Sequence, residues 1–341
     1  MSSNEILLLV PSLNYSKWKG LGRYSYYLYN ILKKKYNVDV IEVQEPKKNY
    51  FKAVFKSFFF GSFFKYKIVH SISPELYFSK FIRNTKKIVT IHDFIPFIDK
   101  SIKTSFKTFL LFLYKLNLQN ADKIISNSTL TSKLLFKLLK KKSIIVNPPV
   151  DLKLFKFRKK KPKEKIILSF ISNFSFRKRV DVAIKVCGML QEKIDCKLIL
   201  AGGKLERSSQ YHFNVIELIK KYNIKDYEIY EEISDKKLVE IYRKSHFFIF
   251  PSKMEGFGIP IIEAQACGTP VLVFKNSFLP REVKKMAIKC VSEVDMCKKI
   301  LELIENEEKY FLIQRKGYEY SKKFSLEIFK EKYIKIYESL L

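Results

Sequence analysis

The chain has 341 residues, 47% of them hydrophobic, and its 65 Lys and Arg against 34 Asp and Glu give a formal charge of +31. This length suits two domains, and the hydrophobic content excludes intrinsic disorder. The charge favours polyanionic partners such as nucleic acid, anionic lipid or phosphorylated substrates, although a genome biased towards Lys, Ile, Phe and Asn codons explains it equally well.

The first half of the chain alternates short β-branched runs with helical patterns. Strand-like runs occupy residues 5–10, 38–43, 68–73, 87–93, 123–128 and 143–146. Helical patterns occupy residues 23–36, 105–119 and 129–140. This alternation is typical of βα units and predicts a parallel sheet.

A segment rich in Phe and Lys, residues 51–67, lies between two of these strand-like runs. On a helix, one face would carry Phe51, Val54, Phe55, Phe58, Phe59 and Phe63. Lys52 and Lys56 lie one turn apart on its flank, and Gly61 indicates a break. The pattern fits a helix packed on the sheet, and it equally fits a basic aromatic surface that makes peripheral contact with an anionic membrane. The sequence leaves both interpretations open.

The alternation breaks at residues 147–165, where paired prolines precede a basic run, and it then restarts. The later strand-like runs are 165–172, 196–203, 227–233, 246–252 and 270–274. We therefore predict an α/β protein with two doubly wound parallel sheets. Its domains would span residues 1–155 and 156–320, followed by a C-terminal helix at 321–341 that packs back on the first domain.

One stretch carries most of the chemical information: residues 250–272, FPSKMEGFGIPIIEAQACGTPVL. A buried strand runs into a glycine-bearing loop, and Pro260 suits the first turn of a helix. Gly258 lets the backbone approach a ligand, and the N–H groups of the helix start can bind phosphate or hydroxyl groups. Glu255 stands in the loop, and we expect Glu263, eight residues later, within the first helical turn.

The pattern E-G-F-G-x-P-x-x-E-A-x-A-x-G-x-P-V in this stretch resembles the signature of the retaining glycosyltransferases of family 4, the glycosyl transferases group 1. That family has the GT-B fold, in which two Rossmann-like domains face a cleft. Six further segments are similar to the family in its order: WKGLGRYSYYLYNIL, TIHDFIP, ADKIISNSTLT, VNPPVDLKLF, SFISNFSFRKRVDVAI and ISDKKLVEIYRKSHFFIFPS. The resemblance covers nearly the whole chain.

The resemblance implies a reaction and two catalytic residues. A hexose of mannose or glucose type would move from a nucleotide diphosphate sugar to a hydroxyl of a glycan or lipid-linked acceptor, with its anomeric configuration retained. Glu255 and the amides of Phe257 and Gly258 would hold the transferred sugar. His92, at the end of a strand in the first domain, would face that sugar from the other side of the cleft.

The same analogy assigns the donor phosphates. Lys178, helped by Arg177, would stabilise the negative charge of the departing diphosphate. Gly20 and Gly22 would bring the backbone of the first loop near the same phosphates. Many family members carry an arginine where Asn173 stands here, so phosphate binding would depend more heavily on the two cations.

The nucleoside part of the donor also has implied contacts. Glu263 would accept hydrogen bonds from the ribose hydroxyls, the loop containing Gly203 would lie near the nucleotide, and the stretch ending at Ile233 would border the base. The segment HDFIP resembles the corresponding segment of family members that transfer mannose, and this resemblance favours GDP-mannose as the donor.

Several other classes lack their motifs. The sequence has no D-x-D, no phosphate-binding P-loop and no G-x-G-x-x-G after a strand, so we expect an enzyme that needs neither a metal nor another cofactor. Two alternatives remain: a basic nucleic-acid-binding protein, or a non-catalytic scaffold with a GT-B-like fold.

The expected location is the cytoplasm, at the cytosolic membrane face if residues 51–67 contact lipid. No apolar run is long enough to span a bilayer, and we identify no signal peptide. The five cysteines are odd in number and form no CxxC pair, which suits a reducing compartment without structural zinc.

Overall fold

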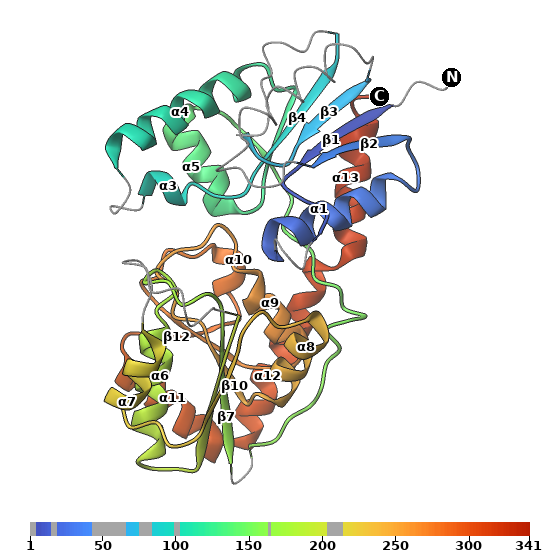
Figure 1. Cartoon of the computed structure of the whole chain (residues 1–341). Coiled ribbons are helices and arrows are strands. Elements are labelled where there is room, and N and C mark those ends of the chain that lie inside the picture. Colours follow the sequence, from blue (N-terminus) through green and yellow to red (C-terminus); the bar gives the residue numbers. More distant parts are fainter. Residues whose placement is uncertain are drawn as a thin grey trace. The chain divides into compact units, whose positions relative to one another are not determined.

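The computed structural model describes residues 5–14, 19–42, 66–74, 84–98, 103–162, 165–202 and 214–341. The chain divides into two compact units (Figure 1), unit 1 with residues 1–149 and 326–341, and unit 2 with residues 150–325. Val150 and Ser325 form a parallel bridge inside unit 2, so the chain enters and leaves this unit at one place. The sequence analysis placed the corresponding limits at residues 155 and 320, and here the breaks follow residues 149 and 325.

Unit 1 contains a parallel sheet with the strand order β2-β1-β3-β4-β5-β6. The strands are β1 (Ile6–Val10), β2 (Val38–Glu42), β3 (Ile68–Ser71), β4 (Lys86–Ile91), β5 (Lys123–Ser126) and β6 (Ile144–Ile145). Each pair of neighbours is parallel. The alternating pattern read from the sequence therefore predicted this sheet correctly.

Helices cover both faces of the first sheet. They are α1 (Lys19–Leu32), α3 (Ile95–Ile98), α4 (Thr104–Gln119), α5 (Thr129–Leu139) and α13 (Leu326–Glu338). On one face, residues of α1 and α13 pack against strand residues such as Leu8. On the other face, residues of α4 and α5 pack against the strand residues in between, such as Leu7. The two sets of helices lie on opposite sides of the sheet (Figure 1). The last helix of the chain thus completes unit 1.

A polar network lies buried under α13. His70 on β3 is fully buried, and its two ring nitrogens lie 2.6 Å from the hydroxyl of Tyr337 and 2.8 Å from the hydroxyl of Thr90. Tyr333 lies next to Thr90, and its hydroxyl also pairs with that of Tyr24 on α1. Burial, together with the proximity of another histidine, lowers the pKa of His70 to about 3. The ring is therefore neutral in the folded chain at physiological pH.

This neutral ring should make unfolding depend on pH. An unfolded histidine titrates near about pH 6.5, so below this value the unfolded chain binds the extra proton and the folded chain does not. The free energy of unfolding should fall as pH falls, by about 2 kcal/mol more between about pH 6.5 and about pH 5 than in a His70→Gln variant. Urea denaturation at each pH measures this difference. Parallel profiles for the two proteins would show that His70 protonates without unfolding.

Unit 2 contains a second parallel sheet, with the strand order β12-β11-β10-β7-β8-β9. The strands are β7 (Ile166–Ile171), β8 (Cys196–Ala201), β9 (Tyr227–Tyr230), β10 (Phe247–Ile249), β11 (Val271–Phe274) and β12 (Ile288–Cys290). From β7 the chain first adds strands on one side and then, from β10 onward, on the other. The order therefore reverses between β7 and β10, the place where ligands of doubly wound sheets bind.

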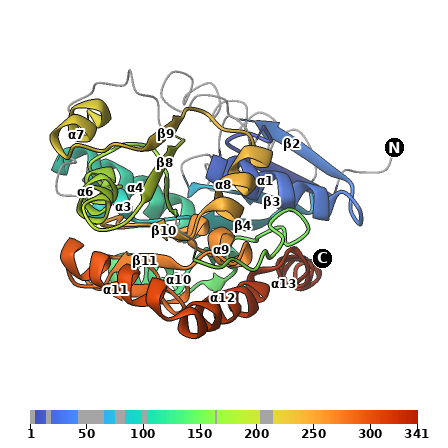
Figure 2. The same ribbon diagram turned by 90° about the horizontal axis from the view of Figure 1, so that it is seen from below.

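Helices also cover both faces of the second sheet. They are α6 (Val180–Gln191), α7 (Val215–Lys221), α8 (Asp235–Lys244), α9 (Ile259–Ala266), α10 (Arg281–Lys284), α11 (Glu293–Glu305) and α12 (Glu307–Ser321), followed by the 3-10 turn η3 (Lys322–Phe324). One core joins α6, α7 and α11 to the sheet, and the other joins α8, α9 and α10. Figure 2 shows α11 and α12 following one another along one side of this unit.

The basic run that we interpreted as a domain boundary is partly built into unit 2. The backbone of Lys160 exchanges two hydrogen bonds with the amide of Gln314, at 3.2 and 2.7 Å. The Lys160 side chain is buried and donates to the carbonyl of Tyr242 at 3.0 Å and to the hydroxyl of Thr269. Burial lowers the pKa of this amine to about 7. A lysine from a strongly basic segment, which would be expected at the surface, is thus part of the buried interior of unit 2.

Some sequence predictions lie outside the described residues. Residues 51–65 and Gly203 are among them, so the membrane and nucleotide roles given to them stay predictions. Within the described ranges, none of the helices combines the length and apolar character needed to cross a bilayer. All five cysteines are buried and free of disulfides.

Candidate active site

Two loops meet where the second sheet reverses its strand order. Residues 172–179 follow β7 and residues 250–258 follow β10, and because these parallel strands are neighbours, both loops leave the same edge. The N–H of Lys253 donates to the carbonyl of Arg177 at 2.9 Å, and the Arg177 guanidinium donates to the carbonyl of Met254 at 2.7 Å. The two loops therefore form one connected surface.

A carboxylate with two cations forms the centre of this surface. Lys178 Nζ lies 2.6 Å from one oxygen of Glu255, and Arg177 Nη1 lies 3.2 Å from the other. The Glu255 and Lys178 side chains are only 10% and 13% exposed. Such a shielded pair interacts more strongly than a surface salt bridge, because little water screens its charges. The sequence predicted all three residues for this site, and the structure brings them together.

The charge state of Glu255 follows from this geometry. Burial acts to raise the pKa of Glu255, but the charges of Lys178 and Arg177, with hydrogen bonds from Lys178 and Ser252, outweigh it and hold the pKa below its ordinary value. The carboxylate is therefore ionised at neutral pH. Two cations around one anion leave a net positive charge, which can attract a second anion.

Arg179, the third cation of the loop, is directed elsewhere. Its guanidinium donates twice to Asp181, with both N–O distances 3.0 Å, and lies 3.6 Å from Glu293. Its backbone is left-handed, with φ 58°, at the start of α6. This turn separates it from Lys178 and Arg177, so two of the three adjacent cations contact Glu255.

The glycine loop leads directly into α9. Gly258 has φ +97°, a conformation that favours glycine, and Pro260 occupies the first turn of the helix as predicted. Phe257 is buried, with its ring centroid 5.7 Å from that of Phe324. The loop is therefore anchored by an aromatic side chain while its backbone turns at the helix N-terminus.

Glu263 lies one turn further along α9 than the sequence analysis expected. The helix begins at Ile259, so Glu263 falls in the second turn, where it is 3% exposed. The hydroxyl of Tyr242, on α8, donates to its carboxylate at 3.2 Å. Tyr242 was missed in the sequence, because the helical pattern of 235–245 marks it as an ordinary core residue.

The Tyr242 hydroxyl should contribute measurably to stability. Hydrogen bonds to charged groups contribute about 1.5–3 kcal/mol, and those between neutral groups about 1 kcal/mol. Tyr242→Phe should therefore lower the free energy of unfolding by more than Tyr310→Phe, since the equally buried Tyr310 hydroxyl donates to a neutral carbonyl, that of His246, at 2.9 Å. Urea denaturation of both variants measures the difference. Equal losses would contradict a stronger hydrogen bond from Tyr242 to Glu263 than from Tyr310 to the carbonyl of His246.

Two weaker assignments, Asn173 and Ile233, lie in loops at the same edge of the sheet. Asn173 is exposed, and its side-chain oxygen accepts hydrogen bonds from the backbone and the hydroxyl of Ser175, so it shapes the loop after β7. Ile233 is half-buried in the loop after β9 and packs against the core that contains α9. Gly202, with φ +97°, directly follows β8 and is the last described residue before Gly203.

The predicted residues of unit 1 also follow strand ends. His92 comes directly after β4, and its ring meets that of Tyr24 edge to face at 4.7 Å. Burial lowers the pKa of His92 to about 4, opposed by a hydrogen bond to the backbone of Ile72, so the ring is neutral. Its Nε2 atom is buried, and within the described part of the chain it has no hydrogen-bond partner.

Gly20 and Gly22 were placed in a loop by the sequence analysis, and this was wrong. Both lie in the first turn of α1. Gly20 is exposed, with open space where a Cβ would be, whereas Gly22 is buried. Within the described residues, the phosphate contact predicted for this segment would come from the N–H groups at the start of α1.

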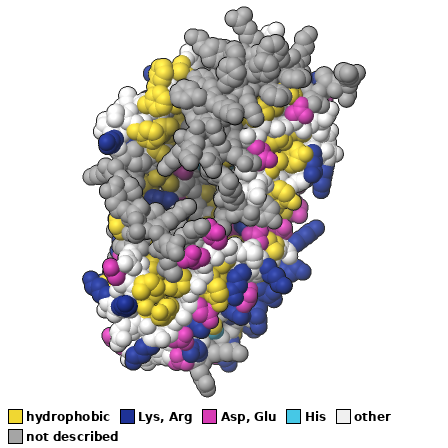
Figure 3. Space-filling view, in the orientation of Figure 1, with side chains coloured by type: hydrophobic (Ala, Val, Ile, Leu, Met, Phe, Trp, Pro, Cys, Tyr) yellow, Lys and Arg dark blue, Asp and Glu magenta, His cyan; other side chains and the backbone are white. Residues whose placement is uncertain are grey.

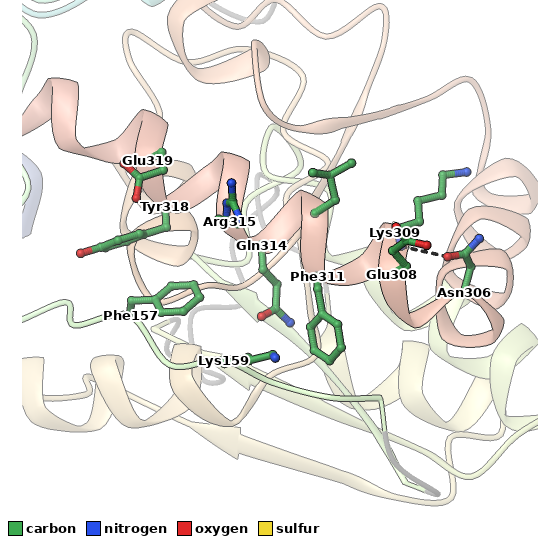
Figure 4. Close-up of a pocket in the computed structure, with 11 residues that line it drawn as sticks. Phe157, Lys159, Asn306, Glu308, Lys309, Phe311, Gln314, Arg315, Tyr318 and Glu319 are labelled. Carbon is green, nitrogen blue, oxygen red and sulfur yellow. Dashed lines mark hydrogen bonds between the residues drawn. The ribbon is translucent and has the colours of Figure 1, made fainter.

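A groove elsewhere on unit 2, with a volume of about 690 Å³, contains none of these residues (Figure 4). It is lined by Phe157, Lys159, Asn306, Glu308, Lys309, Phe311, Leu312, Gln314, Arg315, Tyr318 and Glu319. Its basic and acidic side chains are nearly balanced, and Lys159 Nζ already lies 4.4 Å from the ring centroid of Phe311. The charged edge of the sheet is the better candidate site.

Comparison with known proteins identifies the family. The model of the glycosyl transferases group 1 family matches residues 152–320, which include every predicted site residue of unit 2. An uncharacterized glycosyltransferase of Methanocaldococcus jannaschii is 30% identical over 266 residues, covering 74% of this chain and 68% of that protein. The chain belongs to the glycosyl transferases group 1 family.

Solved structures share the fold of this group 1 glycosyltransferase. Sucrose-phosphate synthase from Thermosynechococcus elongatus matches with a TM-score of 0.80 at 17% identity, covering 98% of this chain and 99% of that one. HepE from Anabaena, solved with UDP and glucose, matches with a TM-score of 0.73 at 15% identity, covering 98% and 100%. The predicted GT-B fold is confirmed. The comparisons do not favour the nucleic-acid-binding or scaffold alternative.

Proposed function

We propose that this group 1 glycosyltransferase is a retaining enzyme of family 4 that transfers a hexose from a nucleotide diphosphate sugar to a hydroxyl of a glycan or lipid-linked acceptor. The observation that carries the proposal is the convergence of Lys178 and Arg177 on the buried, ionised Glu255. This cluster lies where the second sheet reverses its strand order, at the edge where such sheets bind ligands.

The cluster offers complementary contacts to the two halves of a sugar diphosphate. The Glu255 carboxylate accepts hydrogen bonds, so it suits the hydroxyls of the sugar. Lys178 and Arg177 carry the positive charge that a departing diphosphate needs as its negative charge grows. The N–H groups at the start of α9, beginning with those of Phe257 and Gly258, would bind the sugar or the phosphates.

Glu263 and His92 complete the proposed assignments. Glu263, held by Tyr242, would accept hydrogen bonds from the ribose, and Ile233 would border the base. His92 is neutral and has a buried Nε2 atom without a partner in the described chain, which suits a ring that hydrogen-bonds a sugar hydroxyl. Asn173 would act indirectly, by shaping the loop that carries the cations.

The donor proposed for the first test is GDP-mannose, with UDP-glucose as its competitor. The HDFIP segment supports the mannose donor, and the fold shared with HepE, solved with UDP and glucose, makes a uridine donor the natural comparison. The proposed setting is the cytoplasm, at the cytosolic membrane face if the acceptor is lipid-linked. Release of free nucleotide from a panel of nucleotide sugars identifies the donor directly.

Lys178→Ala should reduce turnover about a hundredfold, because it removes a cation placed to stabilise the leaving group. Arg179→Ala is the matched control: it removes the neighbouring cation, which Asp181 and Glu293 hold away from Glu255, and should change turnover less than about fivefold. Turnover is measured at saturating donor with a folded protein. Similar losses in both variants would contradict a specific role for Lys178.

Chelation tests the expectation that no metal is needed. The described residues contain no group of three or more His, Cys, Asp or Glu side chains able to hold a metal ion. Because two cations already face the proposed phosphate position, turnover should survive EDTA unchanged. Loss of turnover that only an added divalent cation restores would contradict the proposed site.

A further inference from the structure

The helix α4 exposes three phenylalanines to solvent. Phe106, Phe109 and Phe112 are 51%, 54% and 57% exposed, and they follow one another at intervals of three residues, about one turn each. A neighbouring side of the helix already packs in the fold, because buried residues such as Leu110 and Tyr114 belong to the core on that face of the first sheet. The three rings are therefore not needed to bury α4 in the fold.

Hydrophobic side chains gather over α4 in the surface view (Figure 3). Leu116, half-buried, continues the stripe one turn beyond Phe112. Single exposed apolar residues are common on proteins, but a contiguous aromatic stripe usually marks a surface that is covered by a partner. The charges around the stripe indicate what that partner is.

Those charges are almost all positive. Lys103 and Lys115 are exposed and flank the stripe, whereas Lys107 is half-buried on another side of the helix. Residues 103–121 contain neither Asp nor Glu. From residue 103 to residue 149 the chain has nine lysines and one acidic residue, Asp122. Asp122 is itself engaged, with one oxygen 3.3 Å from Lys86 Nζ and the other accepting from the N–H of Lys87 at 2.8 Å. An anionic partner is therefore favoured.

We infer that α4 docks unit 1 onto an anionic lipid surface. The phenylalanine rings enter the boundary between headgroups and acyl chains, and the lysines meet the lipid phosphates at headgroup level. Single-stranded nucleic acid also combines phosphate with groups that stack on aromatic rings. The membrane accounts better for Leu116, which has no ring to stack on a base yet extends the apolar stripe.

This surface is distinct from residues 51–67, and the inference does not depend on the proposed sugar transfer. It concerns described residues of α4, none of which has a role in the candidate active site. A protein that binds lipid and transfers no sugar would contradict the proposed function alone. A protein that transfers sugar and binds no lipid would contradict this inference alone.

Flotation of the full chain with vesicles tests the apolar stripe. With vesicles of phosphatidylcholine and phosphatidylglycerol in equal parts, at low salt, the wild type should float. Combined Phe106→Ser, Phe109→Ser and Phe112→Ser should lower the vesicle-bound fraction at least about tenfold, whereas leucine at the same positions should retain most binding. Val291→Ser with Val294→Ser is the control, because these residues of unit 2 are 69% and 64% exposed.

A second set of variants tests the charges. Combined Lys103→Glu, Lys107→Glu and Lys115→Glu should abolish the preference for phosphatidylglycerol over pure phosphatidylcholine. The control Lys220→Glu, Lys221→Glu and Lys236→Glu makes the same change of net charge at exposed positions of unit 2 and should retain the preference. Circular dichroism establishes that each protein is folded. If the serine variant unfolds, the comparison between the two sets of lysine variants still tests whether α4 binds the anionic vesicles.

Three outcomes would overturn the inference. The wild type could stay with the soluble fraction at low salt. Both sets of lysine variants could lose binding equally, which would indicate attraction by net charge without a defined surface. Finally, a polyuridine strand could bind α4, with the serine variant losing that binding while vesicles never bind, which would make the helix a nucleic-acid surface.

Discussion

The contact of Glu255 with Lys178 and Arg177 is the constraint around which unit 2 is organised. Both cations come from the loop after β7 and the carboxylate comes from the loop after β10, so the contact exists because β10 returns to lie beside β7. A buried carboxylate is tolerated only when cations compensate for its lost hydration. The cations in turn need the carboxylate, and this mutual dependence holds the edge of the sheet in one arrangement before any ligand arrives.

Behind that edge, polar groups in the core hold the functional elements in place. Tyr242 joins α8 to Glu263, while its carbonyl accepts from the buried amine of Lys160. In unit 1, the chain of contacts from His70 through Thr90 and Tyr333 reaches Tyr24, whose ring meets His92. Buried polar contacts of this kind are directional, so they fix orientation where apolar packing alone would permit sliding.

The sequence predicted much of the architecture because periodicity and motif spacing are local properties. Strand and helix patterns predicted all strands of the first sheet and all of the second except β12, and the glycine-bearing motif predicted the loop that carries Glu255 and the start of α9. What it could not predict depends on strand order and on packing between distant segments. The sequence pattern alone does not show that Lys178 contacts Glu255 while Arg179 contacts Asp181. It also does not show that the side chain of Lys160 is buried in the core, or that Tyr242 donates a hydrogen bond to Glu263.

The division of unit 1 between the two ends of the chain has a consequence for how the protein is made. The ribosome releases residues 1–149 long before α13, whose Phe329, Tyr333 and Tyr337 complete the core over α1. Until α13 emerges, one face of the first sheet lacks this cover, whereas unit 2 is continuous and can fold as soon as residue 325 emerges. The nascent chain therefore carries an open apolar surface from the time unit 1 emerges until α13 is made, and a chain that stops short of α13 never closes it.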